Sequence, residues 1–328
     1  MSVRLLRPVF LAAAIAVLTA CGGSGNGEPD STTTVLNFFP LSGVVPSPND
    51  LAFAGSEDGT VNAPTGDSPT DATLAVNSQD GFSTIAPMTA TFSEPVDAAT
   101  VVPGQTVRVF EVTTTTTATG AKAVTGLGPD GELTAGTDFT AGLSPADVNG
   151  ATLAVTPLQP LNSGSAYLVV VTNGIHERGG GAIGASSQYQ LAKSPSPLID
   201  DGGNSVVPDL TDAQAQQLEG VRQLVQAQLG AAGAAGVDTS TVVGSWTVTT
   251  QSEGEVLQAV RDQIRSDGTA AAFVDAESTP NRLTDTGADT QPTGAASIYA
   301  GVLAGLPYYL QSGADDPTKV LTGYWQGA

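Results

Sequence analysis

The stretch Tyr167-Leu-Val-Val-Val171 is apolar at every position, and therefore on both faces of any strand that it forms. A half-buried strand alternates apolar with polar residues, whereas a strand covered on both faces is apolar throughout. The stretch therefore predicts a central strand of a β-sheet that is packed between two layers.

Alternating runs on the N-terminal side of this stretch predict a β-sandwich around it. Met88, Ala90 and Phe92 alternate with Thr and Ser residues, as the residues of a half-buried strand do. The apolar residues of two further runs are Val107, Val109, Phe110, Leu153 and Val155. Residues 80–193 are therefore expected to form a mainly β domain, with the Thr-rich run 113–117 as a loop or a strand extension.

Two segments of this domain resemble the Ig-like modules of bacterial surface proteins. Those modules pair a strand exit similar to Phe92-Ser-Glu-Pro-Val-Asp97 with a later strand similar to Tyr167-Leu-Val-Val-Val-Thr-Asn-Gly-Ile175. The resemblance implies an Ig-like β-sandwich at residues 80–193.

The first 21 residues have the organisation of an export signal. Arg4 and Arg7 carry positive charge, and the apolar segment 9–20 is too short to span a bilayer core, which needs about 20 residues. Leu18-Thr-Ala-Cys21 resembles the lipobox of bacterial lipoproteins. This resemblance implies removal of residues 1–20 as a signal peptide, a diacylglycerol on the Cys21 thiol, and acyl chains such as palmitate.

The position of Cys21 weighs against the alternative, an ordinary signal peptide with an incidental Cys. Cys21 is the only Cys in the chain, and it lies at the cleavage position. Several acyl chains anchor a protein far more firmly than one. We therefore expect an exported lipoprotein. Gly22, where an inner-membrane signal has Asp, resembles an outer-membrane address, with the protein facing the periplasm or the cell surface.

The charge balance excludes partners that are themselves strongly negative. The chain has 32 acidic and 11 basic residues, a net charge of −21, and removal of Arg4 and Arg7 with the leader leaves nine bases and a net charge of −23. Such a surface repels nucleic acid and anionic lipid head groups. Membrane attachment is therefore expected to depend on the lipid, and no cofactor is expected.

Composition and periodicity divide the rest of the chain into segments. Residues 21–34 are rich in Gly, Ser and Thr and are expected to form a flexible tether, and residues 35–79 a turn-rich β segment. Residues 194–285 are expected to form a helix, a strand and a second helix. Capping-box patterns predict the two helix starts, at Thr211 with Gln214 and at Ser252 with Glu255.

Five segments resemble, in the same order, the N-terminal region of the bacterial virulence-factor lipases, which include surface lipoproteins. They are Pro46-Ser-Pro-Asn-Asp-Leu51, Gly55-Ser-Glu-Asp-Gly-Thr-Val-Asn62, Asp80-Gly-Phe-Ser-Thr84, Thr172-Asn-Gly-Ile175 and Leu306-Pro-Tyr-Tyr-Leu310. Longer members of this family continue into an α/β-hydrolase domain, which cleaves fatty-acyl esters with a Ser–His–acid triad. The resemblance implies that residues 286–328, with the apolar run 298–310, contain the opening strand of an incomplete hydrolase domain.

The catalytic residues of that family match no position in this sequence. A nucleophile elbow needs Gly-x-Ser-x-Gly, because small neighbours permit the sharp turn that exposes the Ser. No Ser in the chain has Gly at both positions, and neither His-Gly-Gly nor Ser-x-x-Lys is present. An acyl-ester substrate is therefore expected only through a catalytic domain that lies outside this sequence.

Two weaker patterns fall in one segment. His176 is the single candidate imidazole base, but it follows a strand with no nucleophile in view, so a solvated turn residue is the expected role. Gly179, Gly181 and Gly184 match Gly-x-Gly-x-x-Gly. A dinucleotide fingerprint needs a helix after these glycines, and residues 186–191 are expected to form a strand, so we reject this site.

Acidic pairs and aromatic residues give further candidates. The acidic pairs are Asp67 and Asp71, Asp200 and Asp201, and Asp315 and Asp316. None has the spacing of an EF-hand, so solvated loops are expected and calcium is the lesser alternative. The aromatic residues in apolar runs are Trp246, Tyr308, Tyr309 and Trp325, and they are expected to pack in cores rather than to contact lipid.

Three functions fit these observations. The first is a lipid-anchored, non-catalytic N-terminal module of a surface lipase. The second is a stand-alone binding or adhesion lipoprotein built on an Ig-like domain. The third is a small esterase with an unrecognised site, which requires a Ser, an Asp and His176 to converge in one pocket.

Overall fold

The computed structural model describes residues 33–65 and 71–252 and short stretches of the remaining chain. Those stretches are 254, 258–259, 261–262, 265–266, 271–274, 282–285, 297–299, 301–304, 308–310 and 325–327. The chain divides into two compact units, Met1–Ser252 and Glu253–Ala328. The predicted signal peptide, Cys21 and all of the tether but its last two residues lie outside the described residues.

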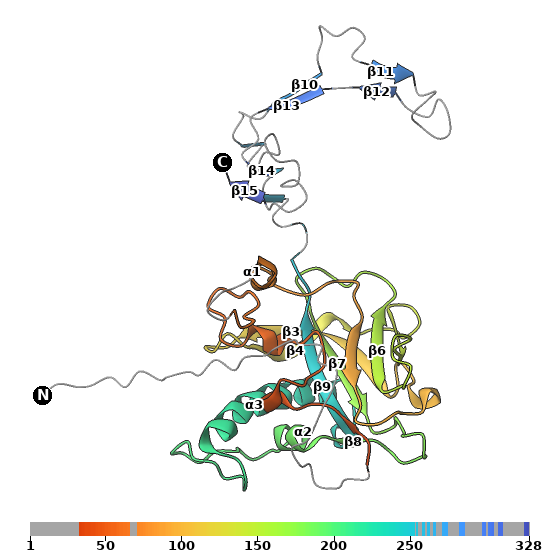
Figure 1. Cartoon of the computed structure of the whole chain (residues 1–328), viewed down its shortest axis with the longest axis vertical. Helices are drawn as coiled ribbons and strands as arrows, with labels where there is room; N and C mark the ends of the chain where they lie inside the picture. Colours follow the sequence, from red (N-terminus) through yellow and green to blue (C-terminus); the bar gives the residue numbers. More distant parts are fainter. Residues whose placement is uncertain are drawn as a thin grey trace, which may run out of the picture. The chain divides into compact units, whose positions relative to one another are not determined.

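Two antiparallel sheets form the body of the first unit (Figure 1). The strand order is β4–β3–β7–β9 in the four-stranded sheet and β2–β6–β5 in the three-stranded sheet. The strands of the first are β4 (Lys122–Glu132), β3 (Val107–Thr116), β7 (Ala166–Thr172) and β9 (Val242–Thr249). Those of the second are β2 (Met88–Thr91), β6 (Thr152–Pro157) and β5 (Phe139–Leu143). The predicted mainly β, sandwich-like fold is confirmed.

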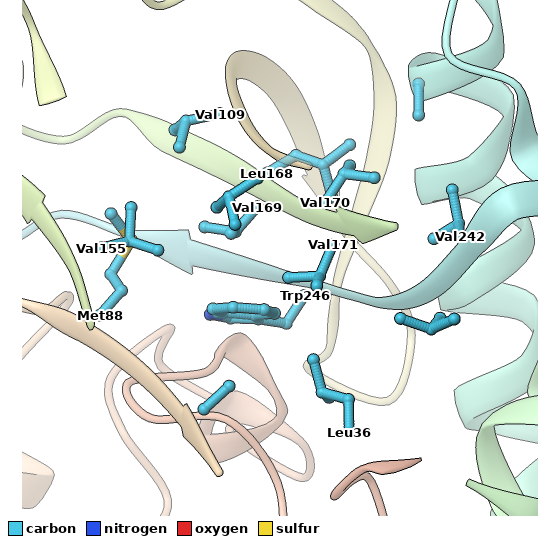
Figure 2. Close-up of a cluster of buried hydrophobic side chains, with 14 of the residues drawn as sticks. Leu36, Met88, Val109, Val155, Leu168, Val169, Val170, Val171, Val242 and Trp246 are labelled. Carbon is cyan, nitrogen blue, oxygen red and sulfur yellow. The ribbon is translucent and has the colours of Figure 1, made fainter. Parts of the chain in front are cut away.

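Strand β7 is buried on both faces, as its apolar sequence predicts. Residues that pair across antiparallel strands share a face, and β7 pairs Val169 with Trp246 and Val170 with Ser245 of β9. Ser245 binds residues of two helices, so Val170 faces the helical layer. On the opposite face, Trp246 lies among the side chains of the sandwich core, as Figure 2 shows.

Two helices cover one face of the four-stranded sheet. The longer one, α3 (Asp212–Ala234), contacts both edge strands, β4 and β9, so it crosses the sheet. Its predicted capping box is present, since Thr211 and Gln214 exchange side-chain-to-backbone hydrogen bonds. The shorter one, α2 (Ser187–Ala192), packs against α3. No helix in the described part of the chain is long and apolar enough to cross a bilayer.

The N-terminal segment wraps around these layers in short elements. They are β1 (Val35–Leu36), the 3-10 helices η1 (Pro40–Ser42) and η2 (Asp50–Phe53), and α1 (Asp71–Asn77). Strand β1 pairs in parallel with β8 (Gly184–Ala185). The 3-10 helices η3 (Ala98–Thr100) and η4 (Thr239–Thr241) occur in later loops. The sequence predicted the short strands and turns of this segment but not helix α1.

Two expectations differ from the structure in the first unit. Residues 187–192 form helix α2 rather than the predicted strand, because the Ser186 hydroxyl accepts the Tyr189 N–H and caps the first turn. Strand β9 lies in the same sheet as β7, although the sequence placed it beyond the sandwich. Strand pairing between residues so far apart leaves no local signal. The Thr-rich run 113–117 largely extends β3, which ends at Thr116.

In the second unit the described strands form antiparallel pairs. They are β10 (Ala271–Val274) with β13 (Gly301–Ala304), β11 (Arg282–Asp285) with β12 (Ser297–Tyr299), and β14 (Tyr308–Leu310) with β15 (Trp325–Gly327). The apolar run 298–310 is divided among three strands rather than one, and Gly and Pro residues within it disfavour a continuous strand. Of the predicted second helix, residues 258–259, 261–262 and 265–266 are helical.

Candidate functional site

The N-terminal strand β1 lies beside the beginning of strand β9. Strand β1 pairs with β8, and the Thr34 hydroxyl donates to a carboxylate oxygen of Glu177 at 2.9 Å. Leu36 packs against Gly244, where a Cβ atom would lie 2.8 Å from a Leu36 methyl group. Any side chain at residue 244 would therefore displace Leu36 from the start of β9.

The chain leaves this unit at the other end of β9, where two segments hold it. The Phe82 N–H donates to the Thr249 carbonyl, and the Gln251 N–H donates to the Phe82 carbonyl, both at 2.8 Å. The Asp80 carboxylate accepts the Ser252 N–H at 3.2 Å and also binds the Ser252 hydroxyl. The motif that begins at Asp80 therefore fixes the direction of the chain up to Ser252.

Gly81 is the residue of this motif that permits the contact. A Cβ atom at residue 81 would lie 2.3 Å from the carbonyl carbon of Thr250, closer than real Cβ contacts. Only Gly therefore lets the two backbones run side by side at the exit.

Entry and exit lie at opposite ends of one strand. A strand advances about 3.3 Å per residue, so Gly244 and Ser252 are roughly 25 Å apart along an extended path. Figure 1 shows β8 at one end of β9 and α1 at the other. Within the first unit, Leu36 and Ser252 therefore lie at opposite ends of β9.

The segment that begins at Pro46 contributes a buried carboxylate to the same strand. Asp50 is 3% exposed, and its two oxygens accept the Thr249 N–H at 2.7 Å and the Thr249 hydroxyl at 2.9 Å. Burial raises the pKa of Asp50, and the hydrogen bonds from Thr249 and Thr247 and the charge of Lys122 oppose that rise. Asp50 therefore satisfies a backbone donor on the outer edge of β9, which no neighbouring strand pairs.

A second buried polar network joins β9 to the helical layer. The Tyr189 and Ser245 hydroxyl groups are 2.7 Å apart, and Ser245 donates to the Gln228 side-chain oxygen at 2.7 Å. Burial raises the pKa of Tyr189 well above its usual value. A phenol that stays protonated acts as a hydrogen-bonding group here, so this network positions α2 and α3 rather than transferring protons.

His176 lies on a half-buried turn after β7. Its N–H donates to the Thr100 hydroxyl at 3.0 Å, and its carbonyl accepts the Asp97 N–H at 2.8 Å. Among the described residues, the hydrogen bonds of His176 with Thr100 and Asp97 use its backbone groups rather than its imidazole ring. The convergence that an esterase site would require is therefore not found among these residues.

A surface groove of about 440 Å³ beside α3 offers hydroxyl groups and one amine. The Lys193 ammonium donates to the Val242 carbonyl at 2.6 Å, and desolvation lowers its pKa. The Ser240 hydroxyl donates to the Asp238 carboxylate at 2.7 Å. The ammonium also donates to the Ser240 carbonyl at 3.4 Å, but the Ser240 hydroxyl binds Asp238 rather than the amine, so these two groups are not arranged as a Ser–Lys catalytic pair.

The glycine pattern is not a dinucleotide site, although a helix follows it. Gly179 and Gly181 lie in a turn, and Gly184 lies in β8. The dinucleotide site was rejected because a strand was predicted after the glycines. That prediction is wrong, since helix α2 follows them. The fingerprint nevertheless requires a parallel strand before the turn, and β7 is antiparallel to both of its neighbours.

The acidic pairs and aromatic residues have the following places. The Asp200 carboxylate accepts the side-chain amide of Asn204 and the backbone N–H groups of Asn204 and Gly202, which lowers its pKa. Within the described ranges, no three His, Cys, Asp or Glu residues are grouped as metal ligands. Asp67, Asp315 and Asp316 lie outside those ranges. Trp246 is 1% exposed and packs in the core as predicted.

The fold and its contacts define a β-sandwich module with a helical layer. The model of the family described as "Bacterial virulence factor lipase N-terminal" matches residues 33–279, which is 247 of the 328 residues. The chain therefore belongs to this family, as the five resembling segments predicted. Membership indicates an exported protein.

Two further comparisons add little. No curated protein matches the chain. The solved structures that match include domains 1–6 of the surface layer protein SbsC, at 22% identity, 31% coverage of this chain, 11% coverage of that chain and a TM-score of 0.19. The N-terminal part of the same S-layer protein gives the same identity and TM-score over 31% of this chain and 19% of that chain. The match spans less than a fifth of either solved chain, and a likeness of this size carries no argument about fold or function.

Sequence reasoning placed the family segments without assigning their contacts. Asp50 and Asp80 were visible as polar residues beside turns, yet Asp50 binds Thr249, the last residue of β9, and Asp80 binds Ser252 beyond it, about 170 to 200 positions later. The signal that was available is an acidic residue followed closely by a large apolar one, Leu51 or Phe82. That pattern predicts a carboxylate at the border of a core.

Proposed function

We propose that this chain is the lipid-anchored, non-catalytic N-terminal module of a bacterial surface lipase. The observation that carries the proposal is the family match over residues 33–279. The substrates of the whole protein are fatty-acyl esters. A separate hydrolase domain, which this module accompanies, cleaves them.

The anchor of the module is the lipidated Cys21. The lipobox that ends at Cys21 and the tether of residues 21–34 support this assignment. The mature net charge of −23 gives the protein no electrostatic attraction to anionic membranes, so the acyl chains supply the attachment. The membrane is the outer membrane, because Gly22 follows the lipidated residue.

The role of the module is to hold the catalytic domain away from the bilayer. The opposite positions of entry and exit on β9 support this role, since the unit then acts as a spacer of roughly 25 Å rather than as a loop that returns to the membrane. The contacts of Asp80 and Phe82 with the exit give that spacer a fixed end.

Membrane fractionation with labelled fatty acid tests the anchor. The Cys21→Ser variant is expected to lose the label and to leave the membrane fraction. Ser24→Ala, three residues further on, serves as the matched control and is expected to remain acylated and membrane-bound. If Cys21→Ser stays labelled and membrane-bound, the anchor is not on Cys21.

A sorting variant tests the location separately. In an enteric host, Gly22→Asp is expected to move the protein from the outer to the inner membrane fraction without loss of acylation. An unchanged distribution would contradict the outer-membrane assignment. Assay of the purified chain with short and long acyl esters is expected to show no hydrolysis above buffer, and measurable turnover would contradict the non-catalytic role.

A further inference from the structure

Asn-Gly pairs are the places in a chain where the thermolabile Asn side chain reacts most readily with the backbone that follows it. The nitrogen of the next residue attacks the side-chain carbonyl carbon, and Gly has no Cβ atom that would block this approach. The sequence contains three such pairs, of which two lie among the described residues. These two are Asn149-Gly150, in the turn between β5 and β6, and Asn173-Gly174, directly after β7.

The first pair lies in a turn that hydrogen bonds close. The Gly150 N–H donates to the Asp147 carbonyl at 3.2 Å, and the Gly150 carbonyl accepts the Val96 N–H at 3.1 Å. The Asp147 carboxylate accepts the N–H groups of Asn149 at 2.9 Å and of Ala151 at 3.0 Å. Gly150 is also buried. Because base must remove the proton from the Gly150 nitrogen before that nitrogen can attack, this turn has to open first.

The second pair is held less tightly. Asn173 and Gly174 are both exposed. The Gly174 N–H donates to the Thr172 hydroxyl at 3.4 Å, and the Ile175 N–H donates to the Thr172 carbonyl, also at 3.4 Å. Both distances exceed the usual range of about 2.7–3.2 Å. The Asn173 N–H donates to the Thr241 carbonyl at 2.8 Å, a contact that uses the backbone and leaves the exposed side-chain amide to solvent.

We infer that Asn173 is a site of spontaneous covalent modification, at which the folded protein converts Asn to aspartate and isoaspartate. The Gly174 nitrogen loses its proton to base and forms a bond to the Asn173 Cγ atom. The side-chain amide takes up a proton and leaves as ammonia, so a five-membered succinimide ring remains. One water molecule then opens the ring. Breaking the new C–N bond gives aspartate, whereas breaking the original peptide bond gives isoaspartate, in which the backbone runs through the side chain.

The conversion changes the end of β7 in two ways. It adds one negative charge to a chain whose net charge is already −21. Isoaspartate also inserts one carbon atom into the backbone between the Asn173 N–H, which binds the Thr241 carbonyl, and Ile175, which is 0% exposed. The contact with Thr241 or the position of Ile175 therefore has to shift. The inference is independent of the proposed function, because it depends only on contacts within the first unit.

Peptide mapping by mass spectrometry tests the inference on the full chain. The folded protein is incubated in water labelled with heavy oxygen at mildly alkaline pH, so that loss of ammonia and uptake of one labelled oxygen mark each conversion. Fragmentation of the peptide distinguishes isoaspartate from aspartate. The peptide that contains Asn149 is the internal control in the same sample. A second sample, unfolded in guanidinium chloride, gives the rate of each pair without the fold.

The expected result is a difference that the fold creates. Relative to its own rate in the unfolded sample, Asn173 is expected to convert at least about tenfold faster than Asn149 in the folded chain. A factor of ten corresponds to about 1.4 kcal/mol, the net contribution of about one or two of the hydrogen bonds that close the Asn149 turn. Equal relative rates, or a faster conversion of Asn149, would overturn the inference.

Two variants separate the reaction from its protection. Asp147→Ala removes the carboxylate that closes the first turn, so it is expected to speed conversion of Asn149 by at least about threefold and to leave Asn173 unchanged. No acceleration would contradict the protective role of the turn. Asn173→Gln requires a six-membered ring, which forms far more slowly, and is expected to remove the label from this peptide. A label that persists there would contradict the assignment to Asn173.

Discussion

A buried carboxylate on α3 allows a quantitative test of how the helical layer is held. Glu219 is 6% exposed and accepts from the Arg222 guanidinium at 2.6 and 2.7 Å and from the Leu198 N–H at 2.9 Å. These bonds lower the pKa of Glu219 from 4.5 to about 2, with the Arg222 hydrogen bonds as the largest cause and the Gln223 amide as a further donor. The change Glu219→Gln removes the charge and one acceptor position.

The lowered pKa converts into an expected loss of stability. A difference of about 2.5 pKa units at about 1.4 kcal/mol per unit gives roughly 3 kcal/mol. Because the pKa in the folded protein lies below its usual value, this contribution is complete above about pH 4.5 and is lost as the pH falls towards 2. Glu219→Gln is therefore expected to lower the free energy of unfolding by roughly 3 kcal/mol at pH 7 and progressively less below pH 4.5.

The assay is urea unfolding followed by the fluorescence of Trp246, in a Trp325→Phe background that leaves only this indole. The matched control is Glu132→Gln, which removes the same type of bond to Arg108 at 2.6 Å but on a side chain that is 36% exposed. Exposed ion pairs contribute about 0–1 kcal/mol. The reasoning is refuted if Glu219→Gln costs no more than the control, or if its cost is unchanged between pH 7 and pH 2.

Three further changes test other contacts of the first unit. Asp50→Ala leaves the Thr249 N–H unpaired and is expected to lower the free energy of unfolding in urea by about 2–4 kcal/mol. The control Asp201→Ala, at an exposed residue, should change it by less than about 0.5 kcal/mol. Equal effects would contradict the contact of Asp50 with the edge of β9. Leu168→Ala opens a cavity beside β7 and is expected to lower the free energy of unfolding by about 2–5 kcal/mol in the same assay. A loss below about 1 kcal/mol would contradict close packing around Leu168. Thr211→Ala removes the cap of α3 and is expected to cost about 1 kcal/mol of unfolding free energy, which Thr211→Ser should largely restore.

Local patterns predicted the parts of the fold that depend on local physics. The apolar stretch at Tyr167 gave a strand buried on both faces, and the capping box at Thr211 gave the start of α3. The run 242–249 was predicted as a strand, but its pairing with β7 was not, because no residue nearby encodes a partner some 75 positions away.

The contacts of individual polar residues could not be predicted from the sequence. Helix α2 was missed because its six residues carry no long apolar repeat, and its start depends on one Ser186 hydroxyl. The contacts of Asp50 and Asp80 depend on the folded positions of β9. The lipobox stays a prediction from sequence alone, because residues 1–32 lie outside the described part of the chain.

The most direct test of the account is the mass of the N-terminal peptide of the protein purified from membranes. Cleavage before Asp30 releases a short peptide, residues 21–29, from the mature chain. The account predicts a peptide that begins at Cys21 and carries the added mass of a diacylglyceryl group and an amide-linked acyl chain. A peptide that begins at another residue, or an unmodified Cys21, would contradict the lipid-anchored module.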